Sequence, residues 1–306
     1  MPPEVKVRIM KNLDAASLSA LTTTCRSMRD VYTQNRGSIN DSVSSKALGH
    51  ARTLAFALYA ANCAPWKAQW PVPNKAQLVR NVHRYGRKYL NHVTDQPSIP
   101  TDQITLPMIL KMGAFHRIVE KLTDSFFDNA VNMHTHKDVP SAGDPSITEV
   151  ARAQRGFYAI EITRVLLPYE VLDDFEFDPA WNVLWHYFSP WENRIARDIE
   201  IWILFMLEWY EIGLSWMRMS PDDTMYRSLN IDHIIARYPE VEIGARDLWY
   251  YLIYVGCKTD KSQMEINIEY ECISWWDLAR FQTLYPGVLP TLQNMQDELM
   301  DYCLKR

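Results

Sequence analysis

The chain has 306 residues, of which 47% are apolar and only 10 are glycine, a composition that suits a compact protein with a large core. Its 32 basic and 37 acidic side chains give a formal net charge of −5, which excludes a global positive field toward nucleic acid or an anionic membrane. The 5 cysteines form no Cys-x-x-Cys motif and lie at no metal-ligand spacing from histidine. We therefore expect a reducing compartment, cytoplasmic or nuclear, and neither a metal nor a cofactor. Residues 1–13 carry charged side chains and no long apolar run, so we expect no secretory leader and no membrane partner.

Residues 1–36 contain three short apolar stripes at helical spacing. Val5, Ile9 and Leu13 recur every fourth residue and share one side of a helix that the preceding prolines can start. Asp14 stands where its side chain can cap the second helix. The later stripes consist of Leu18, Leu21 and Cys25, and then of Met28, Val31 and Tyr32. So small a unit cannot bury three stripes alone, and it needs either a larger body or a partner to cover them.

The remaining sequence predicts helices almost throughout. The predicted segments are residues 40–62, 75–93, 107–131, 147–166, 191–219, 231–238, 245–256, 274–284 and 289–303. No Asn-Gly or Asp-Gly hairpin turn occurs, no strand alternation is convincing, and no repeat of fixed period is present. Prolines and a glycine make residues 137–146 the best candidate for a mobile surface loop. We expect an all-α fold, with a three-helix unit at 1–36 and a non-repeat helical domain at 37–306.

The N-terminal unit resembles an F-box, most closely the F-boxes of filamentous fungi. The positions of the family pattern are occupied by Pro2, Glu4, Val5, Ile9, Leu13, Leu18, Leu21, Cys25 and Met28. Met1 stands where the family usually has leucine, and Met28 stands where many members have tryptophan. The resemblance covers about an eighth of the chain. A second similarity, Arg152-x-x-Arg155-x-Phe157-Tyr158 followed by Phe188-Ser-Pro190-Trp191-Glu192, resembles the helical region behind many fungal F-boxes.

The F-box resemblance implies the substrate-recognition subunit of an SCF-type cullin-RING E3 ubiquitin ligase. The nine residues at the family positions would then dock on a Skp-family adaptor and, through it, on a cullin. The helical domain would hold an unknown target protein for ubiquitination, and the chain itself would be no enzyme. The alternative is an F-box-like helical domain without a ligase role, in either a scaffold for protein interactions or a protein associated with nucleic acid. No nucleophile elbow, phosphate-binding loop, dinucleotide fingerprint or zinc-protease motif occurs in the chain.

Residues 75–93 predict an amphipathic helix with a cationic side. Leu78, Val82, Tyr85 and Tyr89 share one side at 100° per residue. The opposite side carries Arg80, Arg84, Arg87 and Lys88. No Asp or Glu occurs between residues 63 and 94. Two interpretations stay open: a solvated cationic surface, or a site for phosphate on a phosphorylated target or on nucleic acid.

Three further features have both a structural and a functional interpretation. Trp202, Trp209 and Trp216 recur every seven residues, which predicts a helix edge in the core, with a peptide groove as the alternative. Residues 170–178 hold five carboxylates and no cation, which predicts a solvated acidic loop or a docking patch for a basic segment. His134 and His136 lack further metal ligands at the usual spacing, so we expect a surface loop there.

Overall fold

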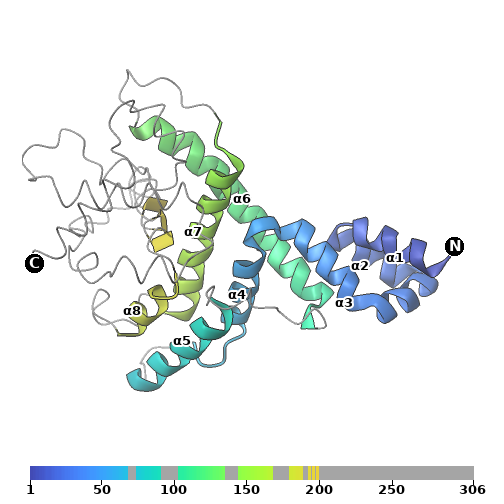
Figure 1. Cartoon of the computed structure of the whole chain (residues 1–306), viewed down its shortest axis with the longest axis horizontal. Helices are drawn as coiled ribbons and strands as arrows, with labels where there is room; N and C mark the ends of the chain where they lie inside the picture. The colour runs from blue at the N-terminus through green and yellow to red at the C-terminus, as the bar shows by residue number, and fades with distance from the viewer. Residues whose placement is uncertain are drawn as a thin grey trace, which may run out of the picture. The chain divides into compact units, whose positions relative to one another are not determined.

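Every regular element that the structure describes is helical. The computed structural model describes residues 1–67, 74–90, 103–134, 144–167 and 179–188, together with residues 192, 193, 195, 196, 198 and 199. No strand occurs within these residues, so the prediction of an all-α fold is confirmed for them (Figure 1).

The helices follow one another along the chain in a simple order. They are α1 (Pro3–Asn12), α2 (Ala15–Thr24), α3 (Arg26–Leu48), the short 3-10 helix η1 (Gly49–Ala51), α4 (Arg52–Asn62), α5 (Lys75–Tyr89), α6 (Leu106–His134), α7 (Ile147–Leu166) and α8 (Pro179–Trp185). The described residues do not include the predicted helices beyond residue 199, the tryptophan series at 202–216, the acidic segment 170–178, His136 or residues 137–143 of the predicted loop.

Local chemistry fixes the first two helix starts. Pro2 and Pro3 occupy the N-cap and first-turn positions of α1, where a missing N–H leaves no intrahelical hydrogen bond unmade. Asp14 caps α2, because its Oδ1 accepts the Ser17 backbone N–H at 2.8 Å. The hydrogen bonds from Ser17 also lower the pKa of the Asp14 carboxyl, since they favour its charged form. The predicted cap is therefore confirmed.

The third helix differs from the prediction. It continues past residue 36 to Leu48, but it is kinked at Asn35, where the dihedral angles are not helical. Gly49 follows with φ of 47°, a left-handed value that glycine adopts without a steric penalty. The prediction of one helix over residues 40–62 was therefore wrong, because Gly49 separates the end of α3 from α4.

The later helices match their sequence patterns more closely. α7 coincides with the predicted segment 147–166, whereas α5 ends at Tyr89, short of the predicted 93, and α6 is slightly longer at both ends than the predicted 107–131. Within α6, the apolar Leu122 keeps 37% of its surface exposed, whereas the polar Thr123 beside it is buried. Leu122 lies roughly 90° around the helix from the centre of the buried side, a rotation that one residue at 100° produces.

The chain divides into two compact units, and the boundary between them falls within α6 and again within α7. One unit comprises Met1–Leu122 and Tyr158–Tyr187. In it, α1 and α2 pack on α3, α4 packs on α3 and α5, and α5 packs on α8. The fully buried Asn40 ties α3 to the segment just before α6. Its Nδ2 donates to the Ile104 carbonyl at 2.7 Å, and its Oδ1 accepts a hydrogen bond from the Tyr32 hydroxyl.

The other unit comprises Thr123–Phe157 and Phe188–Arg306. In its described part, α7 begins with a capping box. The Ser146 backbone N–H donates to the Glu149 carboxylate, and the Glu149 backbone N–H donates to the Ser146 hydroxyl. An edge-to-face contact of the Phe126 and Phe157 rings, with centroids 6.4 Å apart, joins the end of α6 to α7. The Arg155 guanidinium pairs with the nearly buried carboxylate of Glu192.

Candidate functional site

The site residues predicted from the sequence lie on two surfaces, one on the N-terminal helices and the other on one side of α5. In the N-terminal helices, cations from α3 close the exposed ends of α1 and α2. Lys46 Nζ donates to the Lys11 carbonyl at 3.0 Å, and Arg29 Nε donates to the Thr22 carbonyl at 2.8 Å. Carbonyls at a helix C-terminus lack intrahelical donors and carry partial negative charge, so these bonds hold both short helices against α3.

The core of the N-terminal helices rests on residues that the stripe pattern only partly predicted. Met10 and Leu18 are fully buried, and Val31 is nearly so. Met10 was not singled out in the sequence, because it lies outside the row of Val5, Ile9 and Leu13. Residues four apart differ by 400°, so that row drifts by about 40° per step around the helix. The row therefore lies at the border of the buried side instead of at its centre.

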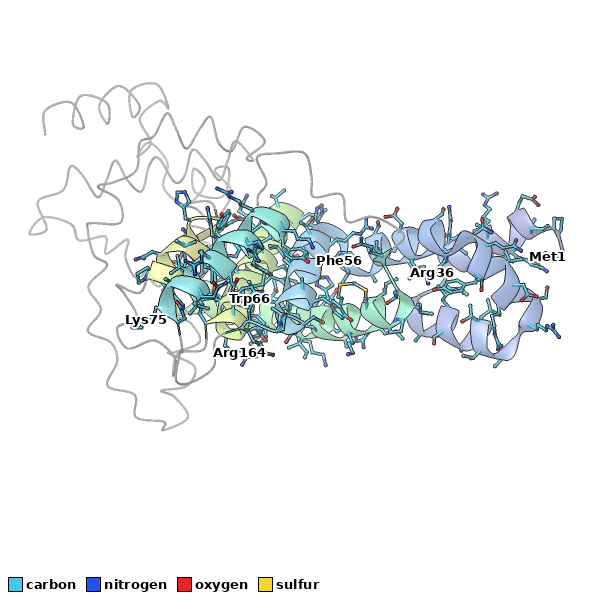
Figure 2. All side chains as sticks on the ribbon, turned by 90° about the horizontal axis from the view of Figure 1, so that it is seen from below. Met1, Arg36, Phe56, Trp66, Lys75 and Arg164 are labelled. Carbon is cyan, nitrogen blue, oxygen red and sulfur yellow. The ribbon has the colours of Figure 1, made fainter. Side chains whose placement is uncertain are left out.

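Because this apolar row rotates away from the buried side of α1, several residues that were predicted to bind the adaptor remain partly exposed to solvent. Val5 keeps 44% of its surface exposed, and Ile9 and Leu13 are half-buried. We call these three residues the N-terminal apolar edge. Leu21, Cys25 and Met28 are also half-buried, Leu18 is fully buried, and Pro2 and Glu4 are exposed. Figure 2 shows the side chains of this region between the labels for Met1 and Arg36.

The second surface is the cationic face of α5, which we define as Arg80, Arg84, Arg87 and Lys88. All four side chains are exposed, as the amphipathic pattern predicted. Among the described residues, no carboxylate forms an ion pair with any of them. The Arg80 guanidinium donates to Gln77 Oε1 at 2.8 Å, which orients it along the helix. Lys88 Nζ lies 4.9 Å from the centroid of the Tyr89 ring.

The opposite side of α5 is firmly anchored. The Tyr85 hydroxyl donates to the Ala57 carbonyl of α4 at 2.6 Å, and its ring meets Trp66 edge-on at 6.1 Å between centroids. The Tyr187 ring lies over Gly86, and its hydroxyl donates to the His83 carbonyl at 3.1 Å. Lys75, at the start of α5, and Trp66 are labelled in Figure 2. These contacts fix which side of the helix faces solvent.

A buried histidine lies in the same unit and was not singled out in the sequence. His116 of α6 is 6% exposed, and its Nδ1 lies 3.3 Å from the hydroxyl of the fully buried Tyr158. Its Nε2 lies 3.9 Å from Glu120 Oε1. Burial lowers the pKa of His116, and the Glu120 carboxylate partly offsets that effect. A histidine within an apolar helical stripe gives no sequence signal of such a partner 42 residues away.

This lowered pKa predicts a loss of stability in mild acid. The folded chain therefore protonates His116 less readily than the unfolded chain, in which a histidine binds a proton below about pH 6.5. Because the unfolded state binds more protons, the free energy of unfolding falls as the pH drops through that value. Urea unfolding between about pH 7.5 and 5.5 should show a shallower decline in His116→Asn than in the unmodified chain. The exposed His50 is the matched control, and an equal change in His50→Asn would contradict the assignment.

Comparisons of the chain with protein-family models, with curated proteins and with solved structures return no match. Within the described ranges, none of the helices combines the length and apolar character needed to cross a membrane. The same residues contain no group of three or more His, Cys, Asp or Glu side chains that could hold a metal ion. Cys25 and Cys63 are both free thiols. The geometry of the two surfaces therefore carries the functional argument.

Proposed function

We propose that this chain is the substrate-recognition subunit of an SCF-type cullin-RING E3 ubiquitin ligase. The proposal starts from the series of residues within 1–36 that resembles the F-box sequence pattern. The single observation that supports it best is the N-terminal apolar edge. Val5 keeps 44% of its surface exposed and Ile9 and Leu13 are half-buried, although the neighbouring Met10 is fully buried. A partly exposed apolar row on packed helices suits docking against the apolar surface of a Skp-family adaptor.

The proposed activity is positional. The adaptor links the chain to a cullin. The helical remainder holds a target protein near the ubiquitin-conjugating enzyme that carries the activated ubiquitin. Holding two reactants together raises their effective concentration, which accelerates transfer without any bond-making group on this chain. The anchored helices α3, α4 and α5 give the adaptor-binding end and the rest of the same unit a continuous connection.

The first test is recovery of the expected partners. The tagged full chain should copurify a Skp-family adaptor and a cullin, and proteasome inhibition should increase the amount of bound target. Failure to bind the adaptor when the two are coexpressed would overturn the proposal. Adaptor binding without a cullin and without accumulation of a target would favour the alternative, an F-box-like scaffold that has no ligase role. Association with nucleic acid in place of the adaptor would favour the nucleic-acid form of that alternative.

A further inference from the structure

We propose that the cationic face of α5 binds a phosphorylated segment of the target protein. This inference rests on the proposed function, because it names the chemistry of the target that the chain would present. It concerns a surface far along the sequence from the N-terminal apolar edge, so the two can be altered and measured independently.

The spacing of the arginines matches a small, highly charged ligand. Arg80, Arg84 and Arg87 lie at i, i+4 and i+7, so they follow one side of the helix over about 10 Å at 1.5 Å per residue. All three are exposed, and the only described hydrogen-bond partner of Arg80 is the neutral Gln77. Like charges this close repel one another, and no described carboxylate reduces that repulsion. An anion bound across them would remove it.

The side-chain type favours phosphate over a carboxylate-rich peptide. A guanidinium presents a planar fork of N–H donors that meets two phosphate oxygens at once, whereas an ammonium acts as a point charge. Three of the four cations are arginine, and the remaining Lys88 has its ammonium over the Tyr89 ring. A phosphorylated side chain carries close to two negative charges and three acceptor oxygens, which neighbouring arginines can share.

The extent of the surface favours a peptide over nucleic acid. Proteins that bind duplex DNA through its backbone commonly neutralise about 6 to 10 phosphates along a broad basic surface. This face offers four cations on one helix, in a chain whose formal net charge is −5. One or two phosphate groups on an extended segment would fit that length and charge.

The helix is also a rigid platform. Hydrogen bonds from Tyr85 to Ala57 and from Tyr187 to His83 fix its inner side to α4 and to the turn that follows α8, both in the same unit. The Gln77 amide both accepts from Arg80 and donates to Asn81 Oδ1 at 3.0 Å. A pre-oriented guanidinium loses less conformational freedom on binding, which strengthens binding without further contacts.

The test uses the full chain and a defined probe. A fluorescent degenerate peptide library centred on phosphothreonine is titrated with the unmodified chain, and the same library with unphosphorylated threonine is titrated in parallel. We expect binding of the phosphorylated library only, and we expect it to weaken steeply as salt is raised. The triple variant Arg80→Glu, Arg84→Glu, Arg87→Glu should bind at least tenfold more weakly. The charge-conserving triple Arg→Lys variant should lose several-fold, because it keeps the charge and loses the fork.

The controls separate this inference from the proposed function. Lys111→Glu, Arg117→Glu, Lys121→Glu makes the same change of charge on exposed positions of α6 and should leave peptide binding unchanged. Adaptor binding is measured on every variant and should be the same in all of them. If the unmodified chain does not bind the adaptor, that result contradicts the proposed function and not the phosphopeptide inference. Equal binding of both libraries, or unchanged binding after the α5 reversal, would overturn the inference. Displacement of the peptide by single-stranded DNA at lower concentration than by unlabelled phosphopeptide would also overturn it, in favour of nucleic acid.

Discussion

Replacing Val5 by Asp is expected to lower the affinity for the Skp-family adaptor by about thirtyfold or more while the chain melts normally. A buried anchor at the centre of an interface typically contributes at least 2 kcal/mol, which corresponds to that factor in affinity. Val5 is 44% exposed in the chain alone, so a polar group there desolvates only when a partner covers it. Val5 also lies in the first turn of α1, where the helix dipole stabilises a carboxylate. The substitution should therefore not lower the stability of the fold.

The control for this prediction is another exposed β-branched residue on a helix. Ile118 of α6 is 53% exposed, and Ile118→Asp should leave both melting and adaptor binding unchanged. Both properties can be measured on the same samples, by thermal unfolding and by calorimetric titration with purified adaptor. Normal adaptor binding by a folded Val5→Asp chain would contradict the assignment of the N-terminal apolar edge. The half-buried pair, changed together as Ile9→Ala and Leu13→Ala, should weaken binding by tens of fold as well.

The sequence was most informative where one signal was local and strong. The Asp14 cap needs only the N–H group of a residue three positions away, and the start of α1 needs only its prolines. The amphipathic pattern of α5 was equally clear, because Leu78, Val82 and Tyr85 are buried while the arginines opposite them are exposed. Both cases depend on helix geometry alone, which a single segment of sequence contains.

Features that depend on distant segments could not be predicted. The Lys46 cap on α1 joins residues 35 positions apart, and the hydrogen bond between Tyr187 and His83 joins residues 104 apart. Met10 was missed because adjacent apolar residues, Ile9 and Met10, compete for the inner side of α1, and only the position of α3 decides between them. Gly49 showed the reverse: one residue ended a helix that the surrounding apolar pattern would have continued.

The strongest prediction for the platform beneath the cationic face concerns Gly86. A Cβ atom at this position would lie 2.2 Å from Tyr187 Cδ2 and 2.6 Å from its Cγ, closer than side chains approach. Gly86→Ala must therefore move the Tyr187 ring and break its hydrogen bond to the His83 carbonyl. Overpacking of this kind typically costs about 1–3 kcal/mol of unfolding free energy. The same substitution in an open helix gains about 1 kcal/mol, so the clash must exceed that gain for the net effect to be destabilising.

A double-mutant cycle distinguishes this steric effect from a general intolerance of α5 to substitution. In a Tyr187→Ala chain the ring is absent, so adding Gly86→Ala should be neutral or stabilising by about 0.5–1 kcal/mol. Gly113 of α6 is the matched control, because a Cβ there meets nothing within 4 Å, and Gly113→Ala should stabilise the chain. Urea unfolding of the four chains of the cycle and of this control gives the coupling energy directly. If Gly86→Ala is as destabilising without the Tyr187 ring as with it, the turn after α8 does not hold α5 through this contact, and the argument that α5 is rigidly held loses its main support.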